Sequence, residues 1–227
     1  MTRVAALYDI HGNLPALEAV LADVPADAEI VVGGDIASGL FPALTLDRLR
    51  GLGERVRWLR GNADRELTSG EEGSSPGDVL AWVRGQLDPE QIGFLHGLPT
   101  SVTLDVHGVG QVLFVHATPR NDVEIFTGRT PEHDVAPCFS GVLADLVVCG
   151  HTHVQFDREI AGLRVVNAGS VGMAYEDAPG AYWLLLGPGV EFRRTAFEPR
   201  ESDYPDEWPS ATREEAVAHF ETRAVRG

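Results

Sequence analysis

Short apolar runs alternate with amphipathic segments along the first quarter of the chain. The apolar runs have the length of buried strands, and they cover residues 4–8, 29–32 and 55–59. Apolar residues at helical spacing predict helices over 14–24 and 42–52. Asn13 and Pro15 suit the start of the first helix, as N-cap and first-turn residues. The order strand, helix, strand, helix, strand predicts βαβ units and a largely parallel sheet.

The rest of the chain contains two more predicted helices and then mostly strands. The helices are expected near residues 78–87 and 89–96. Strands are expected at 101–106, 111–115, 146–149, 155–160, 164–166, 181–186 and 190–196. The first two of these strands flank H-G-V-G, which is a hairpin signal. A last helix is expected over 212–224, where Thr212 and Glu215 match a capping box.

The Gly/Ser-rich stretch at 71–77 is interpreted as an exposed loop and not as a domain boundary. Candidate site residues lie on both sides of it, so we expect a single domain over residues 1–227. The segments 65–100 and 117–140 are expected to cover the site of that domain.

Polar side chains gather directly after the predicted strands. They are Asp9, His11, Asn13, Asp35, Asn62, Asp64, His116, His151 and His153. Because ligands of open α/β sheets bind beyond the carboxyl ends of the strands, these side chains are expected to share one site. Each has an ordinary alternative when taken alone: Asn62 suits a turn, and His151 and His153 could be two surface histidines.

Seven of these side chains are potential metal ligands: two carboxylates, one amide and four imidazoles. They are too many for one tetrahedral zinc, and thiolates are absent from the set. Mixed nitrogen and oxygen ligands suit manganese, iron, cobalt, nickel or zinc. Seven groups could hold two ions if one carboxylate bridges them. Two ions about 3.5–4 Å apart clamp the oxygens of an in-line displacement at phosphorus and acidify a bridging water.

The composition narrows the range of partners. The net charge is −16, whereas duplex-binding proteins normally carry a basic face. A small phosphoester is therefore expected as the partner and a long nucleic acid is not. The two cysteines, Cys138 and Cys149, form neither a disulfide framework nor a zinc pattern, which fits a reducing cytoplasm. No signal peptide or apolar run of about 18 residues is seen, so no membrane attachment is expected.

Five motifs give the chain a family resemblance. D-I-H-G-N, G-G-D, G-N-A-D, V-H-A and G-H-T-H follow one another in this order, and together they resemble the calcineurin-like metallophosphoesterase superfamily. N-A-G-S-V-G at 167–172 resembles the segment after G-H-T-H in the small bacterial phosphodiesterase branch. The resemblance implies an α/β fold, a four-layer αββα sandwich of two mixed β-sheets flanked by helices. It also implies two divalent metal ions at one edge of the sheets.

The resemblance further implies roles for single residues. The seven candidate ligands would divide into Asp9, His11 and His153 for one ion, Asn62, His116 and His151 for the other, and Asp35 as the bridge. Asn13 would lie beside the ions and help to position the substrate or the attacking water. Manganese is the metal most expected, and iron, zinc, nickel and cobalt stay open.

The chain departs from the motifs of the superfamily at two places, and two further residues have open roles. Ala63 stands where many members have a histidine that contacts the phosphate, although the small bacterial branch commonly lacks it as well. Asp64 next to it is a candidate catalytic residue, with a helix cap or an orienting partner as alternatives. G-G-D-I-A-S-G differs from the G-D-x-V-D-R-G of the phosphoprotein phosphatases and argues against that branch. Arg120 could pair with a phosphate oxygen or form a surface salt bridge.

These observations predict a phosphodiester hydrolase in which a hydroxide bridging two metal ions attacks phosphorus in line. A phosphomonoesterase acting on a nucleotide or small metabolite is the nearest alternative. A metal-binding scaffold without catalysis is the alternative of another class, and Ala63 is the feature that suggests it.

Overall fold

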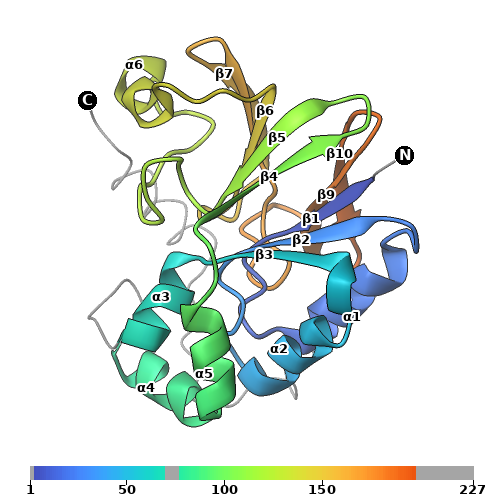
Figure 1. Cartoon of the computed structure of the whole chain (residues 1–227), viewed down its shortest axis with the longest axis vertical. Helices are drawn as coiled ribbons and strands as arrows, with labels where there is room; N and C mark the ends of the chain where they lie inside the picture. Colours follow the sequence, from blue (N-terminus) through green and yellow to red (C-terminus); the bar gives the residue numbers. More distant parts are fainter. Residues whose placement is uncertain (1–2, 70–76, 198–227) are drawn as a thin grey trace.

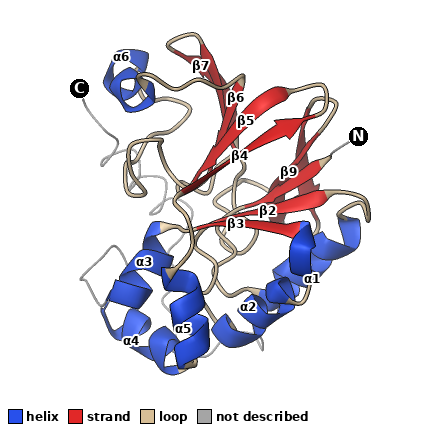
Figure 2. Cartoon of the chain, viewed as in Figure 1, coloured by secondary structure: helices blue, strands red, loops and turns tan. Residues whose placement is uncertain are grey.

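The computed structural model describes residues 3–69 and 77–197, and it contains two five-stranded sheets (Figures 1 and 2). The first sheet has the order β10-β9-β1-β2-β3. Its strands are β1 (Val4–Leu7), β2 (Glu29–Gly33), β3 (Val56–Leu59), β9 (Ala181–Leu186) and β10 (Val190–Thr195). Strands β1, β2 and β3 are parallel, as predicted, whereas β9 pairs antiparallel with both β1 and β10 and makes the sheet mixed.

The second sheet has the order β4-β5-β6-β8-β7. Its strands are β4 (Ser101–Val106), β5 (Gly110–Val115), β6 (Leu146–Cys149), β7 (Phe156–Ile160) and β8 (Leu163–Asn167). Strands β5, β6 and β8 are parallel, and β4 and β7 pair antiparallel at the two edges. The carboxyl ends of the parallel strands of each sheet therefore lie along one edge, which is where ligands bind in such sheets.

The two sheets pack face to face around an apolar layer. Val4 and Ala6 of β1 contribute to it from the first sheet, and Phe114 and Val148 contribute from the second. The alternate residues of β1, such as Leu7, point to the helices on the other side. Both faces of β1 are thus buried, which explains why its sequence is apolar throughout. The predicted αββα sandwich is confirmed.

Helices form the outer layers of the sandwich. They are α1 (Leu14–Asp23), α2 (Pro42–Arg50), α3 (Asn62–Ser69), α4 (Gly77–Gly85), α5 (Pro89–His96) and α6 (Glu132–Val135), with 3-10 turns at Gly53–Arg55 and Ala136–Phe139. Helices α1 to α5 lie on the side of the first sheet, and α6 lies beyond the second (Figure 2). The Asn13 side chain accepts a hydrogen bond from the Ala16 N–H and caps α1, as its sequence predicts.

The short helices α3 and α6 were not expected from the sequence. In α3 the polar residues of G-N-A-D and R-E occupy most positions, so the apolar signal is weak. Arg65 of α3 forms an ion pair with Asp122 at 2.8 Å and so links the two predicted cover segments. Their covering role stays a prediction. The predicted helix over 212–224 lies outside the described residues. Within the described ranges, no helix has the length and apolar character needed to cross a membrane.

Candidate metal centre

The backbone is unusual at the predicted ligands. Six non-glycine residues in the described part of the chain have positive φ, and five of these six are predicted ligands. These five are Asp9 (52°), His11 (47°), Asp35 (51°), His151 (66°) and His153 (58°). Side chains disfavour this conformation, and such strain concentrates at functional sites. The left-handed turns direct the side chains inward from loops that leave the strand ends.

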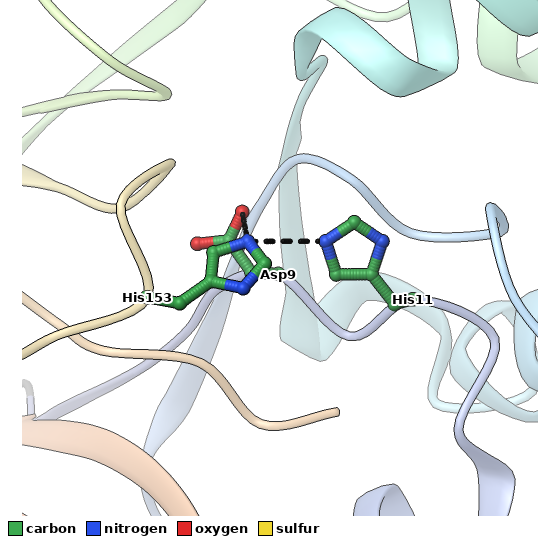
Figure 3. A group of neighbouring side chains, drawn as sticks. All are labelled: Asp9, His11 and His153. Atoms are coloured by element: carbon green, nitrogen blue, oxygen red, sulfur yellow. Dashed lines mark hydrogen bonds and ion pairs between the residues drawn. The ribbon is translucent and has the colours of Figure 1, made fainter. Parts of the chain in front are cut away.

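The first group of donors consists of Asp9, His11 and His153, whose ligand atoms lie within 4.8 Å of one another (Figure 3). The Nε2 atoms of His11 and His153 are 3.2 Å apart. Asp9 Oδ1 is 3.4 Å from His153 Nε2. Three donors from the loops after β1 and β6 therefore converge on one point.

The second group consists of Asp35, His116 and His151, and its ligand atoms meet the same 4.8 Å limit. Asn62 joins this group, because its Oδ1 lies 3.1 Å from His116 Nε2. The structure thus brings the seven predicted ligands together, and Asp35, for which the resemblance implies a bridge, lies with the second group. Their role as metal ligands stays a prediction.

The carboxylates of Asp35 and Asp9 lie between the two groups, close to histidines of both. Asp35 Oδ2 lies 3.8 Å from His11 Nε2 in the first group and 3.5 Å from His116 Nε2 in the second. Asp9 Oδ1 lies 3.9 Å from His116 Nε2 and is therefore also near both groups. The position of Asp35 suits the bridging role predicted for it.

Backbone groups hold the side chains in these orientations. The Nδ1 atoms of His11, His116 and His153 lie 3.1, 2.9 and 2.7 Å from the carbonyl oxygens of Ser38, Gly33 and Met173, respectively. Donation from Nδ1 leaves the Nε2 lone pair facing the centre, as ligating histidines require. The outer oxygens of the carboxylates are held in the same way, because Asp9 Oδ2 accepts from His151 N and Asp35 Oδ1 from Ala63 N.

The residues present fit a pair of divalent cations. Asp9 is fully buried, and its Oδ1 has no hydrogen-bond partner among the described residues. A buried carboxylate oxygen without a hydrogen bond is costly, and a metal ion would satisfy it. The donors are imidazole nitrogens and carboxylate or amide oxygens, which suit first-row transition metals.

Burial and mutual charge shift the pKa values of these groups. Burial acts to raise the pKa of Asp35, but His116 and the other histidines outweigh it and hold that pKa below its usual value. Burial acts to lower the pKa of His116, and the nearby carboxylates raise it to about 10. Burial, reinforced by His116, lowers the pKa of His151 to about 4. Bound cations would replace the protonated imidazole as the partner of the carboxylates.

Comparison with known proteins agrees with this geometry. The family model of the calcineurin-like phosphoesterase superfamily domain matches residues 2–186. The chain belongs to this superfamily. Divalent metals and phosphoester chemistry are characteristic of this superfamily, and both suit a donor set rich in imidazole and carboxylate groups.

Individual superfamily relatives match most of the chain. An uncharacterized protein of Methanocaldococcus jannaschii is 28% identical over 82% of this chain and 74% of its own length. The crystal structure of a metallophosphoesterase from Sphaerobacter thermophilus is 26% identical with a TM-score of 0.69, covering 86% and 89% of the two chains. A hypothetical protein of Pyrococcus horikoshii is 21% identical with a TM-score of 0.75, covering 87% and 89%. The last of these supports the fold alone.

Glycines of the superfamily motifs allow the loops to approach closely. A Cβ at Gly61 would overlap Asp35 Oδ1, and a Cβ at Gly150 would overlap Asp9 Oδ2. Each glycine therefore lies against a carboxylate from another motif, Gly61 against Asp35 and Gly150 against Asp9. These two positions tolerate no side chain while the carboxylates stay in place.

Asp64 lies beneath the centre and is fully buried. Its Oδ1 accepts from Ile36 N at 2.9 Å and its Oδ2 from Gly61 N at 3.1 Å. Burial and the charge of Asp35 raise the pKa of Asp64 to about 7. This geometry fits both structural alternatives considered for Asp64, because its bond to Gly61 N caps the start of α3 and its bond to Ile36 N ties G-G-D to G-N-A-D. A catalytic role for Asp64 stays a prediction.

The two predicted substrate contacts are both engaged within the protein. Asn13 caps α1 with Oδ1 and donates from Nδ2 to Gly172 O at 2.9 Å, which leaves one N–H hydrogen for a substrate. The exposed Arg120 forms an ion pair with Glu124. For Arg120 the structure therefore shows the salt bridge that was the alternative to a phosphate contact.

Sequence reasoning missed the structural task of the segment 167–172. Ser170 Oγ donates to Asp9 O at 2.7 Å, and Asn167 Nδ2 donates to Gly150 O at 2.6 Å. This segment therefore fixes the loops that carry the first and last ligands. Its polar residues stand at the end of β8 and just after it, much as the ligands stand after their strands, and that signal could have found them.

Proposed function

We propose that the protein is a dinuclear metal-dependent phosphoester hydrolase that prefers phosphodiesters to phosphomonoesters. The observation that carries this proposal is the pair of adjacent donor groups with the Asp35 carboxylate between them. A shared carboxylate suits two closely spaced divalent ions, and displacement at phosphorus is a reaction that such ion pairs catalyse.

The chain's own residues fix where the reaction would occur. Bound ions would supply an acidified water and positive charge for the phosphoryl oxygens. His11 and His151, with 11% and 9% of their surface exposed, are the most exposed of the seven ligands. We therefore infer that the phosphoester approaches from their side. Asp9, His116 and Asn62 form the buried floor.

The position after Asn62 limits the range of substrates. Ala63 is buried, and its methyl side chain cannot donate a proton. Its backbone N–H is already bonded to the Asp35 carboxylate. A positioned general acid is typically worth about 10²–10⁴-fold, and poor leaving groups depend on it most. Substrates that release a good leaving group are therefore favoured. The preference for diesters is supported by the resemblance of residues 167–172 to the phosphodiesterase branch.

Initial rates on bis(p-nitrophenyl) phosphate and p-nitrophenyl phosphate test the proposal. The protein is stripped of metal and reloaded with manganese, and Asp35→Asn is compared with Asp27→Asn, which alters an exposed carboxylate. We expect faster diester cleavage that disappears in Asp35→Asn and persists in Asp27→Asn. A clear preference for the monoester would replace the diesterase with a phosphatase.

A non-catalytic metal-binding protein is the second candidate, and the observation favouring it is Ala63. In that case both substrates would stay intact although two ions are bound. Metal content, measured on the same samples, separates this outcome from a protein that was never loaded.

A further inference from the structure

Glu66 is a buried acid next to the candidate metal centre that neither the sequence motifs nor the proposed chemistry uses. It lies on α3 and is only 3% exposed. Glutamate is almost never buried so completely without a partner, because taking its charge out of water is costly. Its burial therefore calls for a reason in the surrounding contacts.

One contact of Glu66 leads to a predicted ligand. Asn62 and Glu66 are one helical turn apart on α3, so their side chains share one face. Asn62 Nδ2 donates to Glu66 Oε1 at 3.2 Å. The other end of the same amide, Oδ1, points toward the centre, 3.1 Å from His116 Nε2.

The chemistry of the two groups makes this arrangement directional. An amide has a donor end and an acceptor end, whereas a carboxylate only accepts. Glu66 therefore selects the orientation in which Nδ2 faces the helix and Oδ1 faces the second donor group. The reversed amide would set two oxygens against each other and turn N–H groups toward a cation.

We propose that Glu66 is a positioning residue that holds the Asn62 amide with its oxygen toward the second metal position. The inference rests on the proposed function, because it requires a metal ion beside Asp35, His116 and His151. Glu66 acts through Asn62 and touches neither substrate nor metal. Glu66 would orient Asn62 as the backbone carbonyl groups orient His11, His116 and His153.

The test is manganese binding to the metal-free protein, measured by calorimetry with metal analysis, in the wild type and three variants. Glu66→Met keeps the length and the helix but removes the acceptor. Glu66→Gln keeps an acceptor oxygen. Thr68→Ala is the matched control, since Thr68 lies on the same helix and bonds to the Asp64 and Arg65 carbonyls.

We expect Glu66→Met to weaken one of the two manganese sites about 10–100-fold and to leave the other site unchanged. Glu66→Gln should stay within about threefold of the wild type, and so should Thr68→Ala. Thermal unfolding of the metal-free variants shows whether any loss comes from the fold.

Three results would overturn the proposal. The first is wild-type affinity at both sites in Glu66→Met. The second is an equal loss at both sites that follows a loss of thermal stability, because this indicates a purely structural role. The third is a wild type that binds fewer than two manganese ions. The third also defeats the proposed function, whereas the first two leave it standing.

Discussion

At the scale of single residues, the centre is built from side chains on left-handed turns. Asp9, His11, Asp35, His151 and His153 adopt positive φ, a conformation that costs energy for residues other than glycine. The surrounding loops repay this cost with main-chain hydrogen bonds, such as His11 N to Asp35 O at 2.8 Å. The ligands are therefore placed by backbone geometry as much as by side-chain rotamers.

A methyl group at Gly61 should disrupt the centre without unfolding the protein. In Gly61→Ala the new Cβ would overlap Asp35 Oδ1, so the carboxylate must leave the position between the two groups. We expect manganese affinity and diester cleavage to fall at least about tenfold, measured by calorimetry and initial rates.

Gly93→Ala is the control for Gly61→Ala. A Cβ at Gly93 would meet no atom within 4 Å, and alanine favours helix α5 by about 0.5–1 kcal/mol over glycine. This variant should keep full metal binding and unfold at slightly higher urea. Equal behaviour of the two variants would contradict the assigned contact of Gly61.

Metal binding should release protons. The carboxylates raise the pKa of His116 to about 10 while no metal is bound, so this ring is protonated near neutral pH. Because a ligating imidazole must be neutral, filling the second site displaces that proton and affinity rises with pH up to about 10. Calorimetry in two buffers of different ionisation enthalpy measures the release, and identical heats in both would show that no proton leaves.

At the scale of elements, strands were easier to predict from the sequence than short helices. Strands β1 and β6 are apolar throughout because both of their faces are buried, so a continuous apolar run was sufficient to find them. Helix α3 contains mostly polar residues and depends on tertiary contacts. For that reason Asn62 was predicted as a ligand, whereas its helical partner Glu66 was not.

The pair Arg65–Asp122 should control the order of the loop after β5. The two side chains are 28% and 16% exposed, so their bond is better shielded than a surface salt bridge. In Arg65→Met we expect faster hydrogen exchange in residues 117–124. Because this segment is expected to cover the site, KM for the diester should rise severalfold while metal affinity stays the same.

Arg164→Met serves as the control, because it removes an exposed pair with Asp157 on the second sheet. It should change neither exchange in 117–124 nor KM. Slow exchange retained in Arg65→Met would mean that other contacts fix the loop.

At the scale of the whole molecule, the apolar layer between the sheets joins distant parts of the chain. The parallel order of β1, β2 and β3 followed from local alternation of strands and helices, but their pairing with β9 did not. Nothing local in residues 181–186 indicates which strand they join. The site was predictable because its motifs stand at strand ends, whereas the mixed sheet depends on long-range packing.

Truncation in this layer should destabilise the entire fold. Phe114 is fully buried between the sheets, and Phe→Ala changes in cores typically cost about 3–5 kcal/mol. Urea unfolding of metal-free Phe114→Ala should show a loss of that size. Leu143→Ala, at a side chain 96% exposed, should change stability by no more than about 0.5 kcal/mol. Similar losses in both variants would place the core elsewhere.

The backbone hydrogen bonds between the ligand loops have a consequence for how such a protein can evolve. Asp9 N bonds to Gly34 O, Gly172 N to Asp9 O, and Gly150 N to His116 O. None of these three bonds involves a ligand side chain, so they hold the loops when a histidine ligand is exchanged, whereas Asp9 and Asp35 also bind the backbone through their carboxylates. Selection could therefore change the preferred metal by single substitutions, with the scaffold already in place to receive each new donor.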